Sequence, residues 1–159
     1  MPQPVGESGP VEKMPVEEMP VEEMPVEEMP VDRMMASDEA SRMLGIEVLD
    51  YGDGWARAQM TVRDDMVNGH GMCHGGLIFA LADTAFACAC NSWGPVTVAA
   101  GCDIVFVAPA RLGDLLVAEG RVRARYGRNG VYDVAVTSGG QLVAEFRGRS
   151  HELGERRPG

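Results

Sequence analysis

The sequence predicts an α+β domain in which one antiparallel sheet of about five to six strands wraps around a single long central helix. Two observations support this. The run from Leu77 to Cys90 has twelve apolar residues among fourteen and no cluster of β-branched residues, which favours a helix enclosed on all sides. The segments on either side of it alternate apolar and polar residues, as half-buried strands do.

The composition limits the kinds of partner. The chain has 159 residues, 45% of them hydrophobic, and its 14 basic and 24 acidic residues give a net charge of −10. Such a surface repels nucleic acid and anionic membranes. The apolar run is shorter than the roughly 20 residues of a membrane helix, and the N-terminus lacks the basic and apolar regions of a signal peptide. We expect a soluble cytoplasmic protein that binds neither nucleic acid nor membrane.

The first 34 residues are repetitive. Residues 10–34 repeat a PVEEM-type pentapeptide five times, and residues 1–34 hold nine acidic and two basic side chains, a net charge of −7. A proline at every fifth position interrupts a helix, and a period of five suits neither helix nor strand. We predict a disordered acidic tail over 1–34, either a neutral expansion or a docking strip, then a domain over 35–152 and a C-terminal tail over 153–159.

The rest of the domain is built from a short helix and strands. Ser37-Asp38-Glu39 is typical of a helix N-terminus, and Gly45 of its end. Gly52-Asp53-Gly54 predicts a turn between the first two strands, and Gly139-Gly140 a two-residue hairpin between the last two. The predicted strands are residues 46–51, 55–62, 96–107, 115–126, 131–138 and 141–150. A sheet of this kind curled around a buried helix is the hotdog fold.

Asp83 is the one acidic or basic side chain in the apolar run. An unpaired carboxylate is costly to bury, so three structural explanations are open: it caps a helix that begins at Thr84, it pairs with a core arginine, or it faces solvent. Acids in apolar surroundings are also where general bases and nucleophiles are found. Asp83 is therefore a candidate catalytic residue.

The turn into the apolar run reads His74-Gly75-Gly76. The first N–H groups of a helix have no intrahelical acceptor, and glycine leaves them uncovered, so they can hold a carbonyl oxygen on which negative charge develops. The glycines could equally serve only to permit a tight turn.

The spacing of the two candidate residues adds a constraint. Gly75 and Asp83 would lie roughly 12 Å apart along one helix at ~1.5 Å per residue. If both act on one carbonyl they come from two subunits, which predicts a homodimer with interfacial active sites.

Four cysteines and three histidines occur without paired CxxC spacings. This pattern does not indicate a zinc module. We expect no metal, no cofactor and reduced thiols at Cys73, Cys88, Cys90 and Cys102.

Several motifs occur in an order and spacing that carry a family resemblance. They are Asn68-Gly-His-Gly-Met-Cys-His-Gly-Gly76, the helical run around Asp83, Cys90-Asn91-Ser92, Gly130-Val-Tyr-Asp133 and Phe146-Arg-Gly-Arg-Ser-His151. With these motifs the sequence resembles the hotdog acyl-CoA thioesterases of the phenylacetate-degradation (PaaI) type, over about residues 36–152.

The resemblance implies roles for single residues. It implies that Asp83 is the catalytic carboxylate, which attacks the thioester carbon or activates the water that does. It implies that the Gly75 N–H polarises the thioester carbonyl, and that Asn68, His74 and Gly76 line the substrate site. The implied substrate is phenylacetyl-CoA or hydroxyphenylacetyl-CoA, cleaved to free acid and CoA by a homodimer or homotetramer.

The phosphates of CoA would need basic partners, for which Arg111, Arg125 and Arg128 are candidates. Arg121, Arg123 and Arg125 alternate along one predicted strand and would project from one face. There they could receive phosphates through forked hydrogen bonds, or pair with neighbouring acids on a solvated face.

Two other functions stay open. Hotdog hydratases use an Asp and a His five residues apart, and Asp65 and His70 have this separation, although the residues between them depart from that motif. The second function is a non-catalytic acyl-CoA-binding domain, which would not need Asp83.

One position departs from related thioesterases. Some of them place a threonine one turn after the catalytic carboxylate, where this chain has Ala87.

Overall fold

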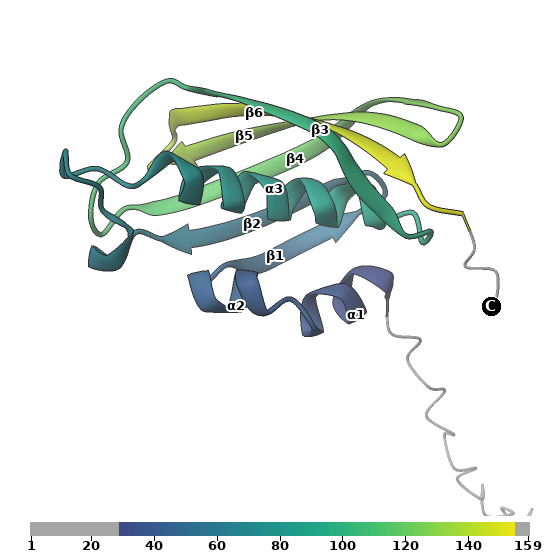
Figure 1. The fold of residues 1–159 in the computed structure, drawn as a ribbon, viewed down its shortest axis with the longest axis horizontal. Coiled ribbons are helices and arrows are strands. Elements are labelled where there is room, and N and C mark those ends of the chain that lie inside the picture. The colour runs from purple at the N-terminus through teal and green to yellow at the C-terminus, as the bar shows by residue number, and fades with distance from the viewer. Residues whose placement is uncertain (1–28, 155–159) are drawn as a thin grey trace, which may run out of the picture.

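One six-stranded antiparallel sheet organises the structure, a computed structural model that describes residues 29–154. The sheet has the order β1-β2-β4-β5-β6-β3, and α3 (Gly75–Asn91) lies across one face of it (Figure 1). The strands are β1 (Glu47–Gly52), β2 (Trp55–Thr61), β3 (Thr97–Phe106), β4 (Leu115–Tyr126), β5 (Asn129–Ser138) and β6 (Gln141–Glu152). Each strand lies within two residues of its prediction, and the predicted hotdog architecture is confirmed.

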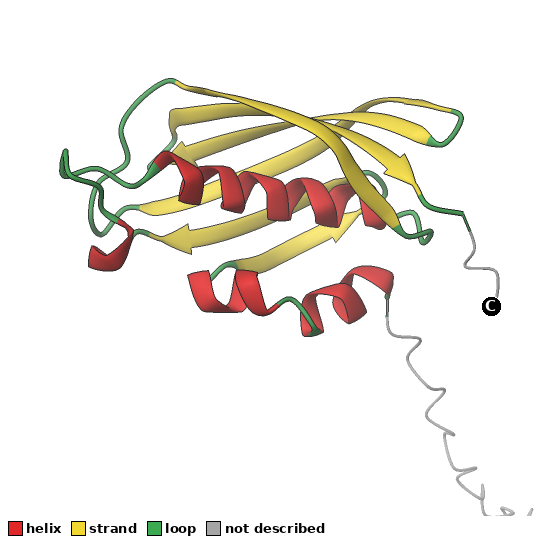
Figure 2. Ribbon diagram, in the orientation of Figure 1, coloured by secondary structure: helices red, strands yellow, loops and turns green. Residues whose placement is uncertain are grey.

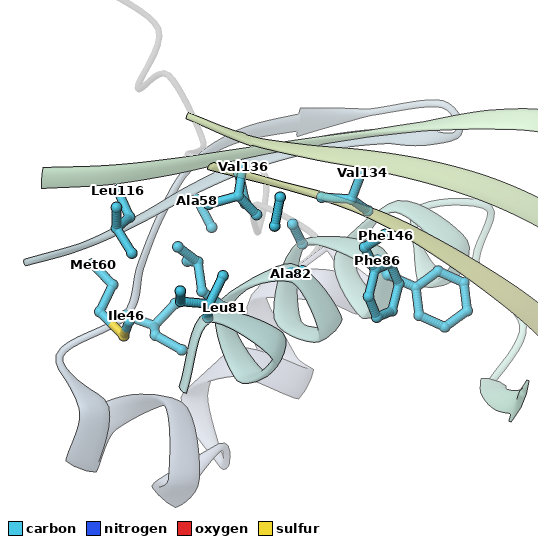
Figure 3. Packing of buried hydrophobic residues seen from close by; sticks show 14 of the residues in the cluster. Ile46, Ala58, Met60, Leu81, Ala82, Phe86, Leu116, Val134, Val136 and Phe146 are labelled. Carbon is cyan, nitrogen blue, oxygen red and sulfur yellow. The ribbon is translucent and has the colours of Figure 1, made fainter. Parts of the chain in front are cut away.

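The core lies between α3 and the inner face of the sheet (Figure 3). Leu81, Ala82 and Phe86 of α3 are at most 1% exposed. Glycine allows the helix to come close, because a Cβ at Gly148 would lie 2.6 Å from the Phe86 ring. Side chains from four strands complete the packing seen in the figure: Ala58, Met60, Leu116, Val134, Val136 and Phe146. Burial of this helix on every side but one leaves a single strip on which polar residues can sit.

Two short helices, α1 (Pro30–Ala36) and α2 (Glu39–Leu44), lie beside β1 and α3 (Figure 2). As predicted, Asp38 caps α2, and Gly45 ends it in the left-handed conformation at φ 69°. A 3₁₀ turn, Asp64–Met66, follows β2. Within residues 29–154, no helix has the length and apolar character to cross a membrane.

The predicted tail boundary is wrong for the last repeat unit. Residues 30–34 belong to α1, and Val31 is only 1% exposed. Pro30 occupies the first helical position, where no N–H is needed, and no proline follows within the helix. In each earlier unit the next proline comes five residues later, which would end such a helix. The remainder of the predicted tail, residues 1–28, and residues 155–159 lie outside the described residues.

Replacing Val31 by alanine should lower the free energy of unfolding by about 1–3 kcal/mol, because a buried valine loses two methyl groups to a cavity. Chemical denaturation followed by circular dichroism measures the change. The same substitution at Val26, the equivalent residue of the preceding unit, serves as the matched control and should leave stability unchanged. Equal losses at both positions would show that the domain extends further into the repeats.

Candidate active site

The N-terminus of α3 has one unused backbone donor. His74 caps the helix, and its Nδ1 accepts the Gly76 N–H at 3.0 Å. The His74 carbonyl accepts the N–H groups of Leu77 and Ile78 at 2.9 and 3.4 Å. Within residues 29–154 the Gly75 N–H has no acceptor. The Gly76 N–H is therefore committed to the cap, and the Gly75 N–H is the donor left free at this end of the helix.

The cap also determines which nitrogen of the His74 ring carries the hydrogen. A neutral imidazole that accepts at Nδ1 carries its hydrogen on Nε2. The His74 side chain is exposed, so Nε2–H is a second donor at the same end of the helix. This arrangement is consistent with a substrate-binding residue.

A cavity of about 380 Å³ opens beside the start of α3. Its walls are mostly apolar, and they are formed by Asn68, Met72, Cys73, Gly75, Ile78 and residues 106–110. Phe106 lies directly against the helix, because a Cβ at position 75 would meet its ring Cζ at 2.9 Å. Glycine at position 75 therefore lets an aromatic wall stand next to the free N–H.

Asn68 organises the loop that leads into the helix. Its Oδ1 accepts the N–H groups of His70 and Met72 at 2.9 and 3.2 Å, and its own N–H donates to the Met72 carbonyl at 2.7 Å. In the part of the chain that the structure describes, its Nδ2 has no acceptor. Asn68 thus shapes the cavity wall and retains two amide hydrogens for a ligand.

The Asp83 side chain is half-buried on α3 and, in the described part of the chain, has neither a hydrogen bond nor an ion pair. Since α3 begins at Gly75, Asp83 does not cap a helix that starts at Thr84. Burial raises the pKa of the Asp83 carboxyl, and the nearby negative charge of Asp38 raises it further. The geometry therefore leaves a carboxylate of increased basicity without a partner.

Gly75 and Asp83 lie on one unbroken helix, as predicted. Eight residues separate them by roughly 12 Å along its axis at ~1.5 Å per residue. One chain does not bring the free N–H and the carboxylate to the same carbonyl group.

The structure does not assemble the pair Asp65 and His70. The Asp65 carboxylate accepts from Arg63 Nε at 3.1 Å, and both Asp65 and His70 are exposed. Among residues 29–154 no contact joins them. An exposed, salt-bridged aspartate is poorly suited to hydration chemistry.

The prediction that three arginines share one face of β4 is wrong. A bulge between Val122 and Ala124 adds one residue to β4. Arg125 therefore pairs with Gly130, and its side chain no longer follows the inward–outward alternation set by Arg121 and Arg123. Such an insertion turns the following side chains to the other face. The Arg125 guanidinium lies 4.4 Å from the Trp93 ring centroid, beyond the end of α3.

Arg121 and Arg123 form ion pairs with neighbouring acidic residues on a solvated face, as the alternative to phosphate binding predicted. Arg123 Nε lies 3.3 Å from Asp133 Oδ2, and Arg121 Nη2 lies 3.9 Å from Glu119. Arg147 donates to both oxygens of Asp133 at 2.6 and 2.8 Å, which lowers the pKa of that carboxyl. These exposed arginines are already engaged with carboxylates.

The remaining candidates for CoA phosphates lie at opposite ends of α3. Arg111, whose backbone N–H donates to Asp114 at 2.8 Å, lies between β3 and β4 and follows Ala110, which lines the same cavity as Gly75 at the start of α3. Arg125 and Arg128 lie at the turn from β4 to β5, near the end of α3 (Figure 1). In one chain these arginines do not converge on one ligand.

The thiols are poorly suited to nucleophilic or metal chemistry. All four cysteines are free, and burial raises the pKa of both Cys88 and Cys90 to about 12. Thiols of such pKa stay protonated near neutral pH. Among residues 29–154, no three His, Cys, Asp or Glu side chains are placed to share a metal ion.

Sequence reasoning missed Phe106 and the Trp93–Arg125 stack. Phe106 could have been found from the run Val105-Phe106-Val107. A half-buried strand alternates apolar and polar residues, and this run has three apolar residues in succession. All three are at least half exposed. The stack depends on a bulge that no residue pattern marked.

Comparison with known proteins gives a consistent result. A family model described as the Thioesterase superfamily matches residues 70–145. The chain is 46% identical over 122 residues to acyl-coenzyme A thioesterase PaaI of Escherichia coli (strain K12), which covers 76% of this chain and 87% of that protein. The solved structure of E. coli PaaI, from the phenylacetic acid degradation operon, is similar with a TM-score of 0.77 and 44% identity, over 79% and 91% of the two chains. The structure of smu.793 from Streptococcus mutans UA159 bound to acetyl CoA has a TM-score of 0.67 and 28% identity, over 70% and 91%.

Proposed function

We propose that this chain, which belongs to the thioesterase superfamily and is a thioester hydrolase, cleaves aryl-acetyl-CoA esters to the free acid and CoA. One observation carries the proposal. A single helix holds a backbone N–H without an acceptor, at Gly75, and a carboxylate without a partner, at Asp83, among the residues that the structure describes. These are the two groups that thioester hydrolysis needs, a donor for the carbonyl oxygen and a base or nucleophile.

We propose that the two groups meet across a homodimer in which two copies of α3 lie antiparallel. If the two-fold axis passes near Phe79, midway between Gly75 and Asp83, then Gly75 of one copy lies at the height of Asp83 of the partner subunit. The unpaired edge of β3 supports this arrangement. Val98, Val105 and Phe106 are 40%, 65% and 51% exposed there, a poor surface to leave in water.

The same arrangement brings the arginines together. In an antiparallel helix pair, the C-terminal end of the partner's α3 lies beside the loop that precedes Gly75. Arg125 and Arg128 of the partner subunit would then approach the end that carries Arg111. Cations from both copies could hold the phosphates of one CoA. The acetyl CoA bound to smu.793 supports a CoA ester as the class of substrate.

Hydrolysis follows from this geometry. The Asp83 carboxylate attacks the thioester carbon directly, or it takes a proton from the water that attacks. In either route the carbonyl oxygen gains negative charge, which the Gly75 N–H of the partner subunit stabilises. The C–S bond then breaks and CoA leaves as a thiolate. After attack by water, the acyl group leaves as the free acid and the thiolate takes up the proton that Asp83 removed. After direct attack, the acyl group stays on Asp83 as a mixed anhydride, which water hydrolyses to the free acid, and the thiolate takes up the proton that this water releases. No metal or cofactor enters these steps.

The aryl preference is supported by the PaaI relative and by the aromatic wall. The cavity beside Gly75 has Phe106 on one side and apolar residues on most others, and an aromatic ring packs well against another ring. A homotetramer, formed by pairing two such dimers, and a cytoplasmic location, where CoA esters occur, complete the proposal.

Thiol release from a panel of acyl-CoA esters tests the proposed function. We expect kcat/KM to be at least tenfold higher for phenylacetyl-CoA and hydroxyphenylacetyl-CoA than for acetyl-CoA, since roughly 1.4 kcal/mol of ring burial suffices. Equal rates for all esters would reject the aryl preference. Loss of crotonyl-CoA absorbance without thiol release would support a hydratase, and binding without turnover a non-catalytic domain.

A further inference from the structure

The carboxylate of Asp38 makes one more contact than a helix cap requires. Its Oδ1 accepts the Ser41 N–H at 2.9 Å, which caps α2. Its Oδ2 accepts the Ser41 hydroxyl at 2.6 Å. The Ser41 hydroxyl is the donor in this contact, so its own oxygen stays open as an acceptor.

That oxygen faces α3. Ser41 Oγ lies 3.0 Å from Thr84 Oγ1, a contact between residues 43 positions apart. Ser41 is 4% exposed and Thr84 9%. The Thr84 hydroxyl also donates to the Ala80 carbonyl at 3.0 Å, so its one hydrogen is shared between that carbonyl and Ser41 Oγ. A chain of contacts thus runs from Thr84 through Ser41 to Asp38, and it ties α2 to one turn of α3.

This turn is the one that carries Asp83. The Asp83 side chain has no hydrogen bond of its own in the described part of the chain, so no hydrogen bond fixes it and its position follows that of the α3 backbone. Thr84 is its neighbour in sequence, and Ala80 stands at the start of the same turn. A contact that fixes the position of Thr84 therefore also fixes the backbone that carries the Asp83 carboxylate.

We propose that the chain formed by Asp38, Ser41 and Thr84 positions the catalytic carboxylate of Asp83, so that α2 takes part in catalysis without touching the substrate. The inference rests on the proposed function, in which Asp83 is the base or nucleophile. It makes Asp38 and Thr84 positioning residues.

The chain also holds a negative charge near Asp83. Burial contributes most to raising the pKa of the Asp83 carboxyl, and the negative charge of Asp38 raises it further. The other ionisable groups that face Asp83 are Cys90 on α3 and Cys102 on β3. Burial raises the pKa of both thiols, so they are neutral where a carboxylate titrates. Asp38 is thus the charged neighbour that shifts the pH at which Asp83 ionises.

Two substitutions separate the charge from the hydrogen bonds. Asp38→Asn keeps a capping residue but removes the charge. Because Asp83 would then ionise more easily, the acid limb of the pH profile of kcat/KM should move to lower pH by a few tenths of a unit, as expected for one charge beyond direct contact. Thr84→Val keeps the shape of the side chain but breaks the chain. It should lower kcat about 3- to 10-fold with little change in KM, while Thr84→Ser should restore the rate.

Ser37→Ala, an exposed serine at the end of α1 without a side-chain hydrogen bond, is the matched control and should match the unmodified protein. An unchanged kcat in folded Thr84→Val would overturn the inference, whatever the acid limb of Asp38→Asn does. If Thr84→Val does not fold, an acid limb that does not move in folded Asp38→Asn would overturn it instead. Asp83→Asn distinguishes this failure from that of the proposed function: an active Asp83→Asn protein overturns both, whereas an inactive one leaves the proposed function standing.

Discussion

Asp83→Asn should lower kcat for thioester hydrolysis by about 10²–10⁴-fold, the contribution of a positioned base or nucleophile. The amide has the shape of the carboxylate, so KM should change little. The assay is thiol release under saturating substrate. Asp53→Asn, in the exposed turn between β1 and β2, is the matched control and should retain full activity.

The same substitution should make the protein more stable. Burial raises the pKa of Asp83 in the folded state, so the folded state holds this proton more tightly than the unfolded state. Above the folded pKa, keeping Asp83 ionised in the fold therefore costs stability, and below the ordinary aspartate pKa it does not. The neutral amide of the variant removes this cost, and thermal unfolding of Asp83→Asn should occur at a higher temperature than that of the unmodified protein at pH 7.

The acid limb of the pH profile provides a third readout. Activity requires the carboxylate, so it should fall on acidification at a pH above the ordinary range of aspartate, because the pKa of Asp83 is raised. A fully active Asp83→Asn protein, or one that is inactive but no more stable, would reject the assignment of Asp83 as a partly buried catalytic base or nucleophile.

The sequence was sufficient to predict the elements that depend on local pattern. The run from Leu77 to Cys90 is apolar at nearly every position, which only an enclosed helix satisfies, and the alternation of the strands fixes which side chains face it. Asp83 was predictable as a candidate for the same reason, since a carboxylate inside such a run conflicts with burial unless it has a use. The cap by His74, which leaves Gly75 as the free donor, depends on a ring position that no pattern encodes.

Features that depend on distant contacts were not predictable. α1 is seven residues long, too short to be stable alone, and it forms because Val31 is buried in the domain. Arg125 was misplaced because one extra residue in β4 reverses the alternation. The contact of Ser41 with Thr84 joins residues 43 positions apart. In each case tertiary packing decides an outcome that the local residues leave open.

Gly75→Pro should lower kcat by about 10²–10³-fold, the loss expected when one oxyanion donor is removed. Proline lacks the N–H in question, and its ring adds a Cβ beside Phe106 that the alanine control shares. In its backbone conformation proline suits this site. Gly75 is the first residue of α3, where proline is favoured, and His74 before it has φ −60° and ψ 130°, the extended conformation that a following proline requires. Gly75→Ala is the matched control. It keeps the N–H, displaces only the exposed Phe106 ring, and should retain most of the activity.

Mixing the two inactive variants shows where the site lies. If Gly75 and Asp83 act from different subunits, a mixed dimer of Gly75→Pro and Asp83→Asn chains has one site with both defects and one with none. Half of the dimers are mixed when equal amounts are refolded together, so activity should recover to about one quarter of the unmodified level. If both residues acted within one chain, every site in the mixture would carry a defect and nothing would recover. Recovery therefore requires a shared site, as the ~12 Å along one helix demands.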